Sequence, residues 1–279
     1  MKKSVNKKNK FGQVTVFIIV AVILVAIGGV ALFTVKGNSK PNDDKFFSQA
    51  NIKPDLNNIK TGILQCRDDS IKLSLNKIGI QGGYFDKPAK SLDIEWAFIP
   101  YYYDQGSYSM PARTKVQIEL GKAVDKSFVD CINKLKFENY IITHGVSKTT
   151  ATINRNLVLF KIDMPLTIKK EDNTMTLEMS DALAEKDSAL FDILDVADYI
   201  TNSHKNDSEM ICVTCVADMA EERNLYVNTF DLLDNSVLVV ISENYTSSEP
   251  YSFEFLNKYV VKLITNTTLS PVPSAAAQV

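Results

Sequence analysis

Histidine is almost absent from this sequence, which has only His144 and His204 among its 279 residues. A histidine-rich metal centre or a histidine-based catalytic triad therefore has few side chains to draw on. His144 precedes Gly145 in a segment of strand-like composition, so we interpret it as a turn residue rather than as a general base.

Catalytic motifs are also missing. The sequence contains no GxSxG nucleophile motif, no HExxH zinc motif, no P-loop and no dinucleotide-binding fingerprint. The acidic pairs Asp43-Asp44 and Asp68-Asp69 are typical of solvated stalk or helix surface. We therefore predict a non-enzymatic protein with no cofactor and no metal site.

Basic side chains are in the minority outside the N-terminus. Residues 36–279 carry 26 basic and 33 acidic side chains, a formal net charge of −7, whereas residues 1–35 carry five lysines and no acid. Binding to nucleic acid needs clustered lysine and arginine against phosphate. The acidic balance therefore argues against nucleic acid as a partner.

A long apolar run is present instead, at residues 14–35. Its 22 residues contain no charged side chain, and a helix of this length spans about 33 Å, enough for a hydrocarbon core of about 30 Å. The lysines before it place the N-terminus in the cytoplasm by the positive-inside rule. We predict a basic cytoplasmic leader at 1–13, a single-pass helix in the bilayer at 14–35 of a cell membrane, and an extracellular remainder.

Two alternatives to a plain anchor follow from the same region. Ala26-Ile27-Gly28 has the small residues of a signal-peptidase site, so a cleaved secretory signal stays open. Gly12-Gln13 before the apolar run resembles the leader of archaeal type IV pilin-like proteins, which are cut between these residues. Phe17 stands where such pilins commonly carry glutamate. The span has no pair of small residues four apart, and so no GxxxG-type dimer face.

The chain beyond the apolar run predicts one folded domain. Residues 36–54 are polar, contain two prolines and predict a stalk. Residues 55–265 predict an extracytoplasmic α+β domain, in which an antiparallel sheet packs with about three helices. Residues 266–279 predict a disordered tail.

Periodicity places the elements of this domain. Helical spacing of apolar residues predicts a helix from about Asp55 to Gly79 or Gly82-Gly83, and others at 113–135 and 182–202. Strand-like runs occur at Tyr140–Val146, Lys148–Ile153, Leu157–Ile168, Thr174–Met179, Leu225–Leu233, Ser236–Glu243 and Tyr251–Ile264. The first four of these runs predict an antiparallel meander.

The first two cysteines, Cys66 and Cys131, each lie on the apolar face of a predicted helix. Outside a membrane such thiols tend to pair, and a bridge would link the two helices. Two unlinked core cysteines are the alternative.

The other two cysteines form a CxxC motif, Cys212-Val213-Thr214-Cys215. A local structural disulfide is the first interpretation. Free thiols, a thiol–disulfide exchange site at a helix start and a metal site are the alternatives. A zinc site needs two further ligands, and His204 is the only histidine nearby.

Surface chemistry offers two further sets of candidates. Three N-x-S/T sequons, at Asn206, Asn244 and Asn266, are acceptors for glycosylation. An aromatic segment at 84–111 contains Tyr101, Tyr102, Tyr103 and Tyr108, which as exposed rings would form a recognition surface. The alternative is a buried strand in which Ile94, Trp96 and Phe98 alternate inward and the tyrosines continue the pattern.

The order of these features resembles a group of single-spanning archaeal surface proteins with no assigned activity. The likeness covers most of residues 10–180 and rests on the Gly12-Gln13 leader, Ile78–Tyr84, the tyrosine-rich segment, one cysteine in each of the first two helices, and Pro165–Lys170. It implies a cell-surface setting and no catalytic residue. We expect a membrane-anchored envelope protein with structural or partner-binding roles, its partners being other envelope proteins or surface glycans. A pilin-like filament subunit and a thiol–disulfide protein using Cys212 and Cys215 are the alternative functions.

Overall fold

A computed structural model describes residues 57–179, 183–206, 212–244 and 250–259. The chain divides into two compact units, 1–40 and 41–279, and every described residue belongs to the second. The predicted leader, apolar span, stalk and tail therefore lie outside the described residues. Among the helices that are described, none is long and apolar enough to cross a membrane.

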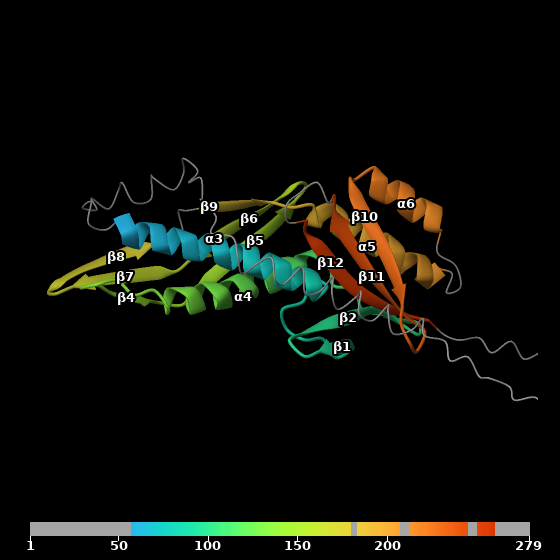
Figure 1. Cartoon of the computed structure of the whole chain (residues 1–279), viewed down its shortest axis with the longest axis horizontal. Helices are drawn as coiled ribbons and strands as arrows, with labels where there is room; N and C mark the ends of the chain where they lie inside the picture. The colour runs from blue at the N-terminus through green and yellow to red at the C-terminus, as the bar shows by residue number, and fades with distance from the viewer. Residues whose placement is uncertain (1–56, 180–182, 207–211, 245–249, 260–279) are drawn as a thin grey trace, which may run out of the picture. The chain divides into compact units, whose positions relative to one another are not determined.

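The described chain is an α+β domain, as the sequence predicts (Figure 1). It contains four helices rather than about three, and its strands form three sheets rather than one. The described helices are α3 (Asn57–Ile80), α4 (Arg113–Ile132), α5 (Leu190–Asn206) and α6 (Val213–Glu221).

Helix α3 ends at a glycine turn, which confirms one of the predicted stop signals. Gly83 N–H donates to Ile78 O at 2.8 Å and Gly82 N–H donates to Gly79 O at 3.1 Å. Gly82 has φ +50°, the left-handed conformation that glycine adopts without a Cβ clash. These paired bonds are a Schellman motif, and they turn the chain out of the helix.

Helices α3 and α4 lie side by side and bury their apolar faces against each other (Figure 1). Ile63, Ile78, Leu120 and Phe128 are fully buried on these faces. Helix α4 also packs on the sheet that contains β5 (Lys148–Asn154). The α3–α4 pair is therefore a central part of the main hydrophobic core.

The largest sheet joins distant parts of the chain, in the order β1-β2-β12-β11-β10, with β3 added to β2. Strand β12 pairs with β2 in parallel, whereas the sequence predicted only antiparallel strands. The other pairs of this sheet are antiparallel. Its strands are β1 (Ser91–Ile94), β2 (Ala97–Asp104), β3 (Ser107–Tyr108), β10 (Leu225–Asp231), β11 (Ser236–Glu243) and β12 (Ser252–Lys258).

The predicted meander is instead two three-stranded sheets, ordered β4-β7-β8 and β5-β6-β9. The run Leu157–Ile168, predicted as one strand, breaks at Met164 because Pro165 has no N–H to continue the ladder. Met164 is fully buried at the break. The remaining strands are β4 (Ile141–His144), β6 (Leu157–Asp163), β7 (Pro165–Lys170), β8 (Asn173–Glu178) and β9 (Leu183–Asp187).

The helix predicted at 182–202 begins later than expected. Residues 183–187 form strand β9, which pairs with β6, and Leu183 is 52% exposed rather than on a buried helix face. Ser188 Oγ accepts the Leu190 N–H at 3.2 Å, which caps α5. The Ala189 N–H donates to Glu243 Oε1 at 2.7 Å, tying this cap to the end of β11.

Candidate functional site

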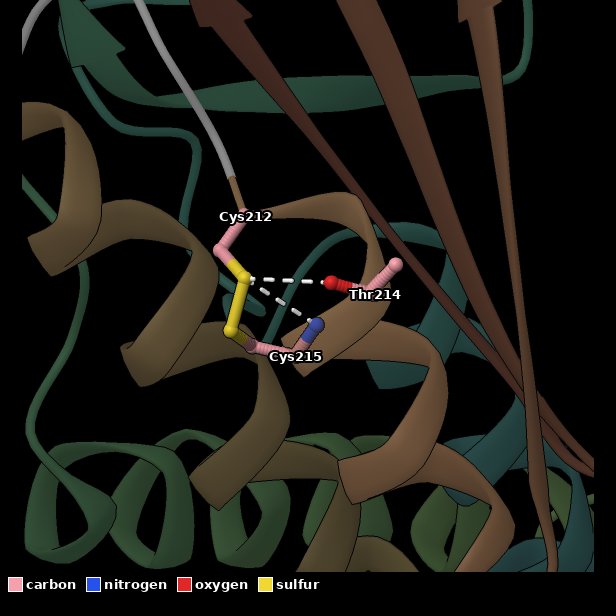
Figure 2. Close-up of a disulfide and its surroundings, with 3 residues drawn as sticks. All are labelled: Cys212, Thr214 and Cys215. Carbon is pink, nitrogen blue, oxygen red and sulfur yellow. Dashed lines mark hydrogen bonds between the residues drawn. A yellow bond between two sulfur atoms is a disulfide. The ribbon is translucent and has the colours of Figure 1, made fainter.

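The CxxC motif is a disulfide at the start of α6 (Figure 2). Cys212 is the N-cap of the helix and Cys215 lies in its first turn. The Cys215 N–H donates to Cys212 Sγ at 3.2 Å, and Thr214 Oγ1 lies 3.4 Å from the same sulfur. The four residues from Cys212 to Cys215 are all exposed. The alternative prediction that Cys212 and Cys215 are free thiols is therefore wrong in this structure.

Helix α6 holds this motif through contacts on its other face. Val216 and Ala220 are buried, and the helix packs against β10 and α5. The Val216 N–H donates to Cys212 O at 3.0 Å, the first backbone bond of the helix. The turn that carries the two cysteines is thus held by backbone bonding and by burial below it, besides the disulfide.

The chemistry open to this site is thiol–disulfide exchange. An exposed S–S bond can be attacked by an external thiolate, and a thiolate at a helix N-terminus is favoured by the helix dipole and by N–H donors. Metal binding has less support. No group of three or more histidine, cysteine, aspartate or glutamate side chains that could hold an ion occurs among the described residues.

The second disulfide joins Cys66 in α3 to Cys131 in α4, confirming the predicted bridge. The two residues are 65 apart in sequence, and Cys66 is only 2% exposed. In the chain-entropy account a loop of this length contributes about 4 kcal/mol, against about 2 kcal/mol for the short loop at Cys212–Cys215. The buried bridge therefore has the clear structural role.

The tyrosine segment lies largely inside the domain. Tyr102 is fully buried, stacks on Phe255 with ring centroids 4.4 Å apart, and donates its hydroxyl to Gly82 O at 2.9 Å. Tyr103 is buried and Tyr101 is half-buried. Burial raises the pKa of Tyr102 well above its ordinary value.

Only Tyr108 of the four proposed recognition tyrosines is exposed. Its hydroxyl donates to Asp198 Oδ1 at 3.0 Å, and partial burial together with this bond raises its pKa to about 12. The buried-strand interpretation is confirmed for Phe98 and Tyr102, which are buried in β2, but is wrong for Trp96, which is 51% exposed at the turn between β1 and β2. A surface of all four tyrosines is therefore excluded by the burial of Tyr102 and Tyr103.

The structure describes some of the predicted glycosylation and processing residues, and it also describes His144. Asn244 follows β11, and its side-chain amide donates to Asn224 Oδ1 at 2.8 Å. Asn206 ends α5, but its side chain is not described, and Asn266, Gly12 and Gln13 lie outside the described residues. His144 is the last residue of β4 rather than a turn residue; its Nδ1 lies 2.7 Å from Gly145 O and its Nε2 lies 3.2 Å from Asn133 Oδ1.

A buried carboxylate on α4 was not anticipated from the sequence. The side chain of Glu119 has no exposed surface, accepts the N–H groups of Phe85 and Asp86 at 3.0 and 2.8 Å, and pairs with Lys115 and Lys122. Burial by itself would raise the pKa of Glu119, but these partners lower it to about 2. Lys115 and Lys122 lie four residues before and three residues after Glu119, on the same face of the helix. This spacing is the sequence signal that could have indicated a paired acid.

An arginine cluster at the start of α5 was also missed. Three of the four arginines of the chain meet here: Arg113 and Arg155 lie 3.8 and 5.6 Å from the Phe191 ring centroid, and Arg223 approaches Asp192. Asp192, Asp195 and Glu222 offset their charge. The cluster therefore makes no uncompensated basic patch for nucleic acid.

No family model, curated protein or solved structure matches the chain.

Proposed function

We propose that this protein is a single-pass envelope protein that displays its α+β domain on the outer side of a cell membrane, in a structural or partner-binding role. The observation that carries the proposal is the disulfide between Cys66 and Cys131. Together with Cys212–Cys215 it leaves no described cysteine free. Full pairing is typical of oxidising compartments and rare in the reducing cytosol.

The sequence before the domain supports the same location. Five lysines precede the uncharged run at 14–35, which is long enough to span a bilayer. The acidic remainder of the chain suits envelope proteins or surface glycans as partners, and not nucleic acid. Trp96, Tyr108 and Tyr226 are exposed aromatic side chains suited to such contacts.

The anchor is tested by the double variant Leu24→Arg/Val25→Arg in the full chain, expressed in cells and fractionated. Each arginine at the centre of a span costs about 2.5–3.5 kcal/mol on insertion scales. We expect the wild-type chain to stay with membranes in alkaline carbonate and the double variant to be lost from them. Leu73→Arg is the matched control, since Leu73 is 54% exposed on α3 and its replacement leaves the anchor intact.

The side of the membrane is tested in the same cells with an added protease. The proposal requires that intact cells lose the domain while the short N-terminal fragment stays protected. A domain that resists until the cells are lysed would contradict the outer location, and a wild-type chain extracted by carbonate would contradict the anchor.

A pilin-like subunit is the second candidate, supported by Gly12-Gln13 directly before the apolar run. Such a protein would lose residues 1–12 and assemble through the retained apolar helix. Intact-mass measurement on the membrane-extracted chain separates the two functions. A mass that includes residues 1–12 excludes processing of this kind, whereas a chain beginning at Gln13 would favour the filament.

A further inference from the structure

The two disulfides of this chain differ in how they are built into the fold. Cys66–Cys131 crosses between two packed helices, and Cys66 is almost fully buried. Cys212–Cys215 spans two intervening residues, and both of its cysteines are exposed. Cys131 is partly buried. Solvent thiols can therefore reach the second bridge in the folded protein more readily than the first.

Opening the exposed bridge leaves its turn in place. The bond from Val216 N–H to Cys212 O is independent of the sulfurs, and Val216 and Ala220 keep α6 seated. The structure therefore depends little on this disulfide. A disulfide that is exposed to solvent and contributes little to the fold is the kind that undergoes thiol–disulfide exchange.

The two sulfurs are not equivalent. Cys212 Sγ accepts the Cys215 N–H and lies within reach of the Thr214 hydroxyl, at the N-terminal end of a nine-residue helix. These donors and the helix dipole stabilise negative charge on Cys212. Cys215 lies inside the first turn, and its sulfur has no such pair of donors described.

We propose that Cys212 and Cys215 form a thiol–disulfide exchange site in which Cys212 is the attacking sulfur and Cys215 the resolving one. Once a low-molecular-weight dithiol has reduced the pair, the Cys212 thiolate attacks a substrate disulfide. A Cys212–substrate bond forms, the substrate S–S bond breaks, and the leaving thiolate takes a proton. Cys215 then attacks Cys212 Sγ, restores the bridge and releases the second substrate thiol. The substrate gains two electrons and two protons, and the cysteine pair loses them.

The substrate class is a disulfide carried by an extended, accessible segment of a protein. Val213, between the two cysteines, is 74% exposed and offers an apolar contact beside the reacting sulfur. A small disulfide such as oxidised glutathione has the same reacting bond but cannot use that contact to the same extent. The activity on a protein disulfide is therefore compared directly with the activity on oxidised glutathione.

The first experiment uses the full chain as Cys215→Ser and, as matched control, Cys212→Ser, each with oxidised glutathione at neutral pH. We expect Cys212, left alone in Cys215→Ser, to form a mixed disulfide about tenfold faster than Cys215 does in the control, because thiolate stabilisation of about this size is common at helix N-termini. Mass spectrometry measures the adduct, and circular dichroism shows whether each variant is folded. Equal rates, or a faster Cys215, would overturn the assignment of Cys212.

The second experiment uses the wild-type protein and compares the reduction of its two disulfides. The wild-type full chain is titrated with dithiothreitol, its thiols are blocked, and each bridge is mapped. We expect Cys212–Cys215 to open at a dithiol concentration at least tenfold below that which opens Cys66–Cys131, with no loss of folded signal. Bridges that open together, only on unfolding, would end the proposal.

The substrate arm compares insulin with oxidised glutathione, using dithiothreitol as the reductant. The wild-type chain should speed insulin reduction above the dithiol background, more than it speeds glutathione reduction, and the Cys212→Ser chain should not. An equal effect on both would show that the site does not prefer a protein disulfide, and would overturn the protein-substrate part. No effect on either would overturn the exchange activity.

Discussion

Glu119 shows how a single residue can be buried and remain charged. Two backbone N–H groups and two lysines surround a carboxylate with no exposed surface. Burial opposes the charge, and the four partners more than offset it, so that its pKa falls to about 2. The residue links α4 to the loop at 85–86 and holds that loop against the helix.

Replacement of this residue, Glu119→Gln, should destabilise the protein at neutral pH. The lowered pKa of Glu119 corresponds to about 3 kcal/mol as an upper bound, reduced by solvent screening of the half-exposed lysines. The carboxylate stabilises the fold above its unfolded pKa near 4.5, and this contribution is lost as pH falls towards 2. The difference between variant and wild type should therefore be constant near neutral pH and shrink below pH 4.5.

Urea unfolding at pH 7 and at pH 3 measures this difference. Glu222→Gln is the control, because the Glu222 side chain is exposed and lies 3.5 Å from Arg223; its effect should stay within about 0.5 kcal/mol. A difference at pH 3 as large as that at pH 7 would show that the charge is not the cause. Glu254 acts in the opposite sense, since desolvation raises its pKa to about 7, and it cancels in the comparison.

At the scale of elements, the α3–α4 pair is linked by a largely buried disulfide and α6 carries an exposed one. The pairing of α3 with α4 brings Cys66 and Cys131 together, with Cα atoms 5.6 Å apart. The loop that this bridge closes is long, so it restricts the unfolded chain strongly. The loop closed by the exposed bridge is short and already helical.

Removing the two bridges separately should give different losses of stability. We expect Cys66→Ser/Cys131→Ser to lower the free energy of unfolding by about 4 kcal/mol and Cys212→Ser/Cys215→Ser by about 2 kcal/mol or less. Chemical denaturation of the two double variants under identical conditions measures both. A larger loss at Cys212/Cys215 would mean that α6 depends on its disulfide, contrary to the backbone bond and burial that hold it.

At the scale of the whole domain, one continuous core connects elements from both ends of the described chain. Phe255 in β12 is fully buried and stacks on Tyr102 in β2, where the two strands pair in parallel. The last described strand, β12, therefore lies inside a sheet begun more than 150 residues earlier. Loss of packing at this contact should affect the domain as a unit.

Phe255→Ala should lower the free energy of unfolding by about 3–5 kcal/mol, because a buried aromatic ring leaves a cavity. Calorimetry should show a single transition moved to lower temperature. Phe230→Ala is the control, since Phe230 is 37% exposed on the outer strand β10, and its effect should be near 1 kcal/mol or less. Two separate transitions in Phe255→Ala would contradict a single cooperative core.

Much of the local structure could be predicted because its cause is local. Apolar residues at helical spacing indicated α3 and α4, and Gly82-Gly83 marked the end of α3 through its backbone freedom. The pairing of Cys66 with Cys131 followed from two cysteines on apolar helix faces. The α+β class followed from the separation of helices and strands.

The sequence by itself determined the location of the apolar run, the helix faces, most strands and the four cysteines as candidates for bridging. The tertiary structure decided which strands pair, since the parallel contact of β2 with β12 depends on a long-range loop closure without a local signal. It also decided that Tyr102 is buried and Tyr108 exposed, because neighbours distant in sequence cover one ring and not the other. The exposure of Cys212–Cys215 was likewise decided by the tertiary structure. The sequence spacing allows the bridge to form, and the packing of α6 leaves it exposed to solvent.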